Sequence, residues 1–235
     1  MNVGQRFLGV FFSPKQTLEK TALNPVWVDA LIILLIALVI FSYVTHPYTL
    51  KDQLDLFKNN VKMRERLGEE RFQETLTRLE NPNPKNTILQ VFILSPLTIL
   101  IGFLFSSFIL LILGRFFSVE GNFKGVLSVY LHVNFIDKIL GNGLRLGLIL
   151  SKKSVALTTT SLALFFPKLE TTSTAFIILS QIDFFQLWMF AVLGYGLSAI
   201  FKIDYRKALF ISYGFWLLKS LFYIAISLLG KQLMG

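Results

Sequence analysis

Polar and charged side chains gather in one otherwise apolar stretch of this 235-residue chain, 123–150. They are Asn134, Asp137, Lys138, Asn142 and Arg145. At 100° per residue they fall within about 140° of one helix face, opposite an apolar face. Three interpretations fit such a helix. It lies in the membrane interface, it spans with its polar face satisfied inside a bundle, or it lines a groove for lipid headgroups or a solute.

A second polar feature is Lys219, near the middle of the last apolar run, 208–229. An unpaired ammonium group at that depth costs about 3 kcal/mol on insertion scales. If 123–150 and 208–229 both start on the same side, Asp137 and Lys219 lie at nearly the same depth. We therefore expect an intramembrane pair of Asp137 with Lys219. The remaining polar residues, Asn134, Lys138, Asn142 and Arg145, then form a polar groove. Lys138 and Arg145 give this groove an excess of positive charge, which suits phosphate headgroups.

The residue patterns of enzymes are mostly missing. The chain has no cysteine, its two histidines are far apart, and it contains no HExxH, GxSxG or P-loop pattern. GYGLSA at 194–199 fits the loose GxGxxA form but lies inside an apolar run with no preceding strand. We expect a protein that is not an enzyme, with no catalytic, cofactor-binding or metal-binding residues. The small residues at four-residue spacing predict close helix packing instead: Gly102 with Ser106, and Gly194 with Ser198.

The composition predicts a membrane protein. Hydrophobic residues make up 54% of the chain and charged residues 16%, against about a quarter charged in a soluble domain. Runs near the length needed to cross a bilayer predict five spans in an all-α transmembrane bundle. These runs are 26–44, 88–113, 123–150, 184–201 and 208–229. The net charge of +9 favours contact with anionic lipid and not with nucleic acid.

Residues 1–25 are expected to form an amphipathic interfacial helix ahead of the first span. As a domain, this first span is taken as 26–45. Phe7, Leu8, Phe11 and Phe12 supply its apolar side. Several residues have the types and positions of helix caps. Ser13 with Gln16 predicts a capping box ahead of Pro14, Asn24 caps the first span, and Asp183 with Gln186 opens the fourth.

Two segments outside the spans complete the expected division. The stretch 46–87 is rich in charge and reads as an extramembrane helical hairpin with a break at Gly68. The remaining four spans occupy 88–235. Within this range, the apolar runs of 151–183 are too short to cross the membrane, so this segment is expected to be interfacial, re-entrant or packed on the bundle. Lys and Arg near the span ends favour an N-terminus on the inside.

Three stretches resemble a known family. FFSPKQTLEK followed by NPVW and a span is similar to the start of the prokaryotic branch of the YIP family, five-span proteins related to the Ypt/Rab-interacting proteins. GRFFSVEGNFKGVLSVYLH resembles that family's turn between its second and third spans. IDFFQLWMFAVLGYGLSAIFKIDYRKALFISYGFWLL, with Trp188, Gly194 and Gly196, resembles its last two spans. The resemblance implies a non-enzymatic accessory protein of a prokaryotic cytoplasmic membrane.

Two functions follow as expectations. In the first, the protein binds and organises another membrane assembly, and some relatives imply an ABC-type exporter. Lipid and a membrane-protein partner are then its contacts, and a homodimer is permitted. In the second, it carries lipid or a small solute along the polar face of 123–150. A closed polar face favours the first function, and an open groove favours the second.

Overall fold

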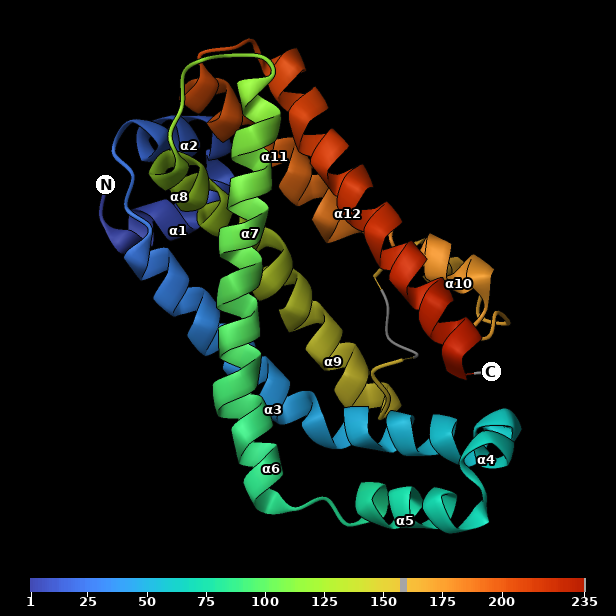
Figure 1. Ribbon diagram of the computed structural model, residues 1–235. Coiled ribbons are helices and arrows are strands. Elements are labelled where there is room, and N and C mark those ends of the chain that lie inside the picture. The colour runs from blue at the N-terminus through green and yellow to red at the C-terminus, as the bar shows by residue number, and fades with distance from the viewer. Residues whose placement is uncertain (157–159, 235) are drawn as a thin grey trace.

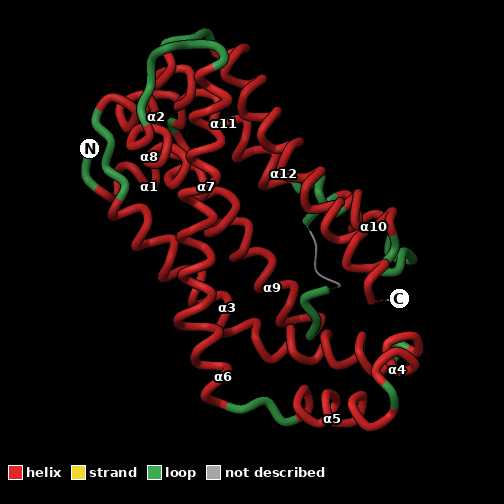
Figure 2. Tube along the Cα trace, viewed as in Figure 1, coloured by secondary structure: helices red, strands yellow, loops and turns green. Residues whose placement is uncertain are grey.

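The computed structural model describes residues 1–156 and 160–234, with side chains up to Lys231, and these residues are overwhelmingly helical (Figures 1 and 2). The helices of the first half are α1 Val3–Phe12, α2 Pro14–Leu23, α3 Val28–Lys58, α4 Val61–Leu67, α5 Glu69–Glu80, α6 Pro84–Leu89, the π-helix η1 Gln90–Leu94 and α7 Ser95–Arg115. Those of the second half are α8 Phe123–Asn134, the π-helix η2 Phe135–Gly141, α9 Asn142–Lys152, the 3-10 helix η3 Leu162–Phe165, α10 Thr174–Leu179, α11 Phe184–Phe201 and α12 Tyr205–Met234. The expectation of an all-α polytopic bundle is confirmed.

Four helices in the described chain are long and apolar enough to cross a membrane. They are Val28–Lys58, Pro84–Arg115, Phe184–Phe201 and Tyr205–Lys231. The third of the five predicted spans, 123–150, is not among them. Its charges lower its hydropathy, although α8, η2 and α9 run on from one another from one end of the bundle toward the other (Figure 1).

The third helical unit, α8–η2–α9, forms the centre of the fold. Every residue from Gly125 to Asp137 is buried, all round the helix. α1, α2, α3, α7 and α11 pack against α8. A helix lying in the membrane interface would leave one face uncovered, so this burial favours the interpretation in which the polar face is satisfied inside the bundle.

Glycines allow the closest helix contacts. A Cβ on Gly196 of α11 would lie 2.2 Å from Cγ1 of Val129 on α8, and one on Gly114 of α7 would lie 2.0 Å from the Phe201 ring. Since real Cβ atoms do not approach so closely, only glycine fits at either position. These contacts bring α11 against both α8 and α7 and set the spacing of the bundle's core.

The N-terminal segment forms two helices that fold back on each other. Gly9 of α1 and Thr17 of α2 touch at the crossing, where a Cβ on Gly9 would lie 2.2 Å from the threonine hydroxyl oxygen. Phe7 and Phe11 turn inward and pack on the core, whereas Phe12 is 84% exposed. The segment is thus part of the bundle, and its aromatic residues are divided between the core and the surface.

Two predicted caps are wrong. Ser13 precedes α2 and Pro14 is its first residue, but the Ser13 side chain makes no capping hydrogen bond, so it forms no box with Gln16. A capping box does occur one helix earlier, between Asn2 and Gln5. Asn24 ends α2 and does not cap the first span, because the chain stays non-helical up to Trp27 and α3 begins at Val28.

The predicted hairpin 46–87 is built from α4, α5 and the end of α3. α3 passes without a break through the expected boundary at residue 45 and changes direction along its length (Figure 1). It contains Pro47, whose missing N–H and ring disturb a helix. Phe57 stacks on Phe72 with 4.7 Å between ring centroids, and Lys58 pairs with Glu80 at 2.8 Å. These contacts fold α5 back along the end of α3.

Candidate functional site

A buried ion cluster joins the central helical unit to the start of α11. The Asp137 side chain is 2% exposed. One of its oxygens accepts from Arg145 at 2.8 Å, and the other pairs with Lys138 at 2.8 Å. Arg145 also pairs with Asp183 at 2.9 Å. Two carboxylates therefore share one guanidinium group, whose fork of donors suits such bridging.

The remaining donors of Arg145 are also occupied. Its Nε donates to the Thr160 hydroxyl at 3.0 Å and its Nη1 to the Asn142 side-chain oxygen at 2.8 Å. The Phe185 ring lies beneath the guanidinium, with 5.8 Å from Cζ to the ring centroid. Asn142 and Arg145, predicted to line a polar groove, are therefore engaged with protein groups. Asn134 is also buried, and its amide donates to the Tyr130 carbonyl oxygen at 2.7 Å.

The π-helix η2 positions the acidic half of the cluster. Asp137 and Arg145 are eight residues apart and would be separated by about 12 Å of rise on a regular α-helix. Asp137 lies in η2, and its carbonyl oxygen also accepts from Arg145 at 3.3 Å. π-helical turns are found frequently at functional sites. No residue pattern in the sequence indicates this turn.

Asp183 ties the cluster to the segment before α11. Its carboxylate accepts from the backbone N–H groups of Phe185 and Gln186 at 2.9 and 3.1 Å, so it caps α11. The hydroxyl of Thr160 donates to its second oxygen at 2.5 Å. Ser161 and Asp183 form an isolated antiparallel bridge. The two ends of the loop 161–182 therefore lie together at the ion cluster.

The predicted pair of Asp137 with Lys219 is not formed. Asp137 is occupied by Lys138 and Arg145, and the Lys219 ammonium donates to the Gln186 side-chain oxygen at 3.0 Å. Gln186, expected in a capping box, therefore extends to Lys219. The Phe190 ring lies 5.5 Å from the Lys219 nitrogen. Lys219 thus contacts only neutral groups directly, and no ion pair of Lys219 occurs in the described chain.

A second buried ion pair holds the N-terminal helices. Arg6 of α1 donates to Asp29 in the first turn of α3, and both side chains are mostly buried. Asp29 is an acid in the first turn of α3, where the helix dipole favours a negative charge whether or not it is paired. Because the two residues lie 23 positions apart on different helices, no local spacing indicated the contact.

The small residues predicted for helix packing behave differently in the two helices. Gly194 meets Leu209 and Tyr205 of α12, where an added Cβ would lie 2.9 and 3.0 Å away. The Ser198 hydroxyl donates to the Ile203 carbonyl oxygen at 2.6 Å in the turn before α12. Gly102, in contrast, has no atom within 4 Å of an added Cβ, and Ser106 beside it is half-buried. The pair on α7 therefore provides no tight packing contact within this chain at Gly102.

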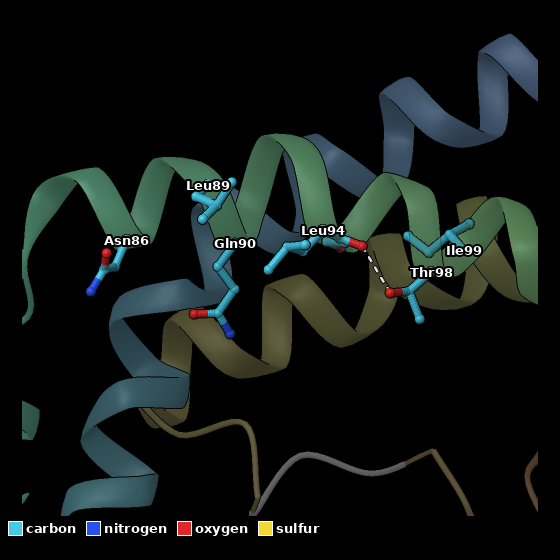
Figure 3. Close-up of a pocket in the computed structure, with 7 residues that line it drawn as sticks. Asn86, Leu89, Gln90, Leu94, Thr98 and Ile99 are labelled. Carbon is cyan, nitrogen blue, oxygen red and sulfur yellow. Dashed lines mark hydrogen bonds between the residues drawn. The ribbon is translucent and has the colours of Figure 1, made fainter.

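A shallow groove follows the π-turn η1 at the start of α7 (Figure 3). It is lined by Asn86, Leu89, Gln90, Leu94, Ser95, Thr98 and Ile99. The Thr98 hydroxyl donates to the carbonyl oxygen of Leu94 at 2.8 Å and so is already occupied. Pro96, which lacks an N–H, follows the wide turn directly. Nothing charged lines this groove, and it is separate from the ion cluster.

The sequence matches the Yip1 domain over residues 8–227. The chain belongs to the Yip1 domain family. Searches of curated proteins and of solved structures gave no match. The family match extends through the N-terminal helices, the hairpin, the ion cluster and α12 up to residue 227.

Membership confirms the resemblance to the YIP family and the expectation of an integral membrane protein. The prokaryotic branch and the number of five spans stay predictions. The Yip1 domain of this chain presents long apolar faces, as on α7, where Ile101, Phe105 and Phe108 are more than half exposed. Such faces are stable against lipid tails and unfavourable in water. The protein is therefore in contact with the bilayer.

Proposed function

We propose that this Yip1-domain protein is a non-enzymatic accessory protein that binds and organises another membrane assembly. The observation that carries the proposal is the closed ion cluster. Asp137, Arg145 and Asp183 use their charges on one another, and Asn134 and Asn142 are bonded within the bundle. A carrier would need these groups free to meet a solute or headgroup. An ABC-type exporter is the assembly that the family resemblance suggests.

The hairpin of α4, α5 and the end of α3 supplies the proposed docking surface. It lies beyond the apolar helices at one end of the molecule (Figure 1). Its outward side carries charges of both signs, among them Arg71, Glu74 and Arg78, all exposed. Asp52 fixes the arm to the bundle by accepting from the backbone N–H groups of Val155 and Ala156 at 2.7 and 2.8 Å. A fixed arm presents these charges in one arrangement, which favours a specific partner.

The proposed location is a prokaryotic cytoplasmic membrane with the N-terminus inside. Support comes from the turn 116–122 and the turn between α11 and α12, which lie at one end and are joined by Lys202 and Glu120 at 3.1 Å. α2 packs on α8 and α11, and the Ala22 carbonyl oxygen lies near Gly125, so the N-terminal segment lies at that end too. The basic residues of all three segments then face the same side, as the positive-inside rule requires of inner loops.

Photocrosslinking in native membranes tests the function. A photoreactive residue replaces exposed Gln73 on α5 or exposed Phe12 on α1, and the products are identified by mass spectrometry. We expect a membrane protein in stoichiometric yield from at least one position. A matched probe at Phe108, on the lipid-exposed face of α7, should give lipid products. Crosslinks from Gln73 and Phe12 only to lipid and to the chain itself would contradict the proposal.

A further inference from the structure

We propose that Lys138 and Lys219 form a docking point for an acidic side chain, Asp or Glu, in a transmembrane helix of the partner protein. The inference rests on the proposed accessory function and names the chemistry of the partner. It starts from the charges of the ion cluster. Asp137 and Asp183 supply two negative charges, and Lys138, Arg145 and Lys219 supply three positive ones.

The unneutralised charge is on the lysines. Arg145 is shared by two carboxylates, and Lys138 pairs with Asp137. Lys219 has only the Gln186 amide oxygen and the Phe190 ring as direct contacts. Gln186 connects Lys219 to the cluster, because the Gln186 backbone N–H donates to Asp183 at 3.1 Å. One further carboxylate beside the lysines would therefore neutralise the excess positive charge of the cluster.

Both lysines remain reachable from outside the chain. The Lys138 side chain is 34% exposed, and Lys219 is half-buried. Leu218 on one side of Lys219 and Leu221 two residues after it are about half exposed. Leu140, two residues after Lys138, is 43% exposed. The lysines are therefore bordered by an apolar surface of the kind that another transmembrane helix packs against.

Depth distinguishes a transmembrane carboxylate from a lipid phosphate. Lys219 is 14 residues from Tyr205 and 12 residues from Lys231, the ends of the apolar part of α12. At 1.5 Å per residue it lies about 18–21 Å from either end along the helix. The hydrocarbon core is about 30 Å thick, so its centre is about 15 Å from the headgroup region. A carboxylate on a spanning helix occurs at that depth, whereas a headgroup does not reach it without deforming the bilayer.

A second copy of the chain cannot supply this acid. The five apolar runs contain two carboxylates, Asp29 and Asp137. Asp29 pairs with Arg6, and Asp137 pairs with Lys138 and Arg145. The complementary residue must therefore come from a different protein. An Asp or Glu in a partner span needs a cation for the same physical reason that Lys219 needs an anion.

The test uses synthetic spans with the full-length protein. The protein is reconstituted in phosphatidylcholine vesicles with labelled Leu-rich peptides of about 22 residues, and association is measured by energy transfer. The peptides differ only at the central residue, which is Asp, Asn or Lys. We expect the Asp peptide to associate about tenfold more tightly than the Asn peptide, and the Lys peptide to associate least.

Variants assign the effect to the lysines. Lys219→Met and Lys138→Met should each reduce the preference for the Asp peptide, and the double variant should abolish it. Lys219→Glu should favour the Lys peptide. Lys207→Met removes an exposed charge from the start of the same helix and should leave the preference unchanged. If a variant fails to fold, the comparison of peptides with the unaltered protein still decides.

Two outcomes would overturn the inference. One is equal association of the Asp and Asn peptides with the unaltered protein. The other is Lys219-dependent binding of phosphatidylglycerol vesicle lipid together with no preference for the Asp peptide, which would identify a headgroup site. Crosslinking from Gln73 on the hairpin tests the accessory function separately, so that function can stand when the charged docking point fails.

Discussion

Arg145 and Asp183, 38 residues apart in the chain, form an ion pair with 2.9 Å between a guanidinium nitrogen and a carboxylate oxygen. The contact joins the first turn of α9 to the N-cap of α11. Asp183 also caps α11, and Arg145 also binds Asp137. One guanidinium group therefore holds together the central helical unit, the start of α11 and the two ends of the loop 161–182.

Replacing Arg145 should therefore be strongly destabilising. Arg145→Met leaves Asp137 and Asp183 without their shared cation, and an uncompensated buried charge costs about 3–5 kcal/mol. Arg145→Lys keeps the charge but loses the fork of donors, so its stability should lie between those of Arg145→Met and the unaltered protein. Thermal unfolding in detergent measures the order. Arg71→Met, on an exposed side chain of α5, should change stability by no more than about 0.5 kcal/mol. Equal stability of Arg145→Met and the unaltered protein would contradict the bridging role.

The sequence predicted the helices well and their contacts poorly. Length and apolarity are enough to identify α3, α7, α11 and α12, since a span needs about 20 apolar residues in one run. The charge on 123–150 was also noticed correctly, and Asp137 and Arg145 were placed on one arc. Their pairing within one helix was missed because it involves a π-turn at Phe135–Gly141 that no residue pattern marks.

Lys219 shows a second limit of sequence reasoning. Its depth correctly indicated that it needs a partner, and depth alone suggested Asp137. Rotation about the helix axes decides which side chains meet, and it brings Lys219 to Gln186 and the Phe190 ring. Two of the predicted caps failed for a related reason, whereas Asp183 does cap α11. Ser13 and Asn24 have the right types, but the chain on either side of α2 follows packing of the N-terminal helices on the core.

Gly196 should tolerate no side chain while Val129 is opposite it. Gly196→Ala places a Cβ 2.2 Å from Cγ1 of Val129, and overpacking of a core typically costs about 1–3 kcal/mol. Val129→Ala in the same chain should recover part of the loss by making room. Gly102→Ala is the matched control, because nothing lies within 4 Å of its added Cβ and alanine favours helix by about 1 kcal/mol. Unfolding midpoints in detergent that do not separate Gly196→Ala from Gly102→Ala would refute the packing argument.

The Arg64–Glu69 pair should make the hairpin sensitive to acid. A hydrogen bond from Arg64 and a second from Gln73 lower the pKa of Glu69 from 4.5 to about 2. A carboxyl whose pKa is lower in the folded state stabilises above its unfolded pKa. Its contribution is thus complete above about pH 4.5 and is lost as the pH falls toward 2.

Amide exchange at the start of α5 measures this effect. Protection of the Phe72 amide, which donates to the Gly68 carbonyl oxygen at 3.0 Å, should fall between about pH 4.5 and pH 3, after correction for the intrinsic pH dependence of exchange. Glu69→Gln should remove that change, since the side chain no longer titrates. Glu70→Gln, on the neighbouring exposed residue, should leave it in place. A fall in protection that persists in Glu69→Gln would show that another group is responsible.

Asp52 should hold the hairpin against the segment after α9. One oxygen of its carboxylate accepts from the N–H groups of Val155 and Ala156 and from the Ser154 hydroxyl at 3.2 Å. Asp52→Ala removes this acceptor, and the loss of a hydrogen bond to a charged group costs about 1.5–3 kcal/mol. Exchange of the Val155 and Ala156 amides should accelerate about tenfold or more. Asp55→Ala removes an exposed acid about one turn further along α3 and should leave both rates unchanged. If Asp52→Ala leaves them unchanged as well, the arm is held to the bundle by other contacts and the carboxylate has no anchoring role.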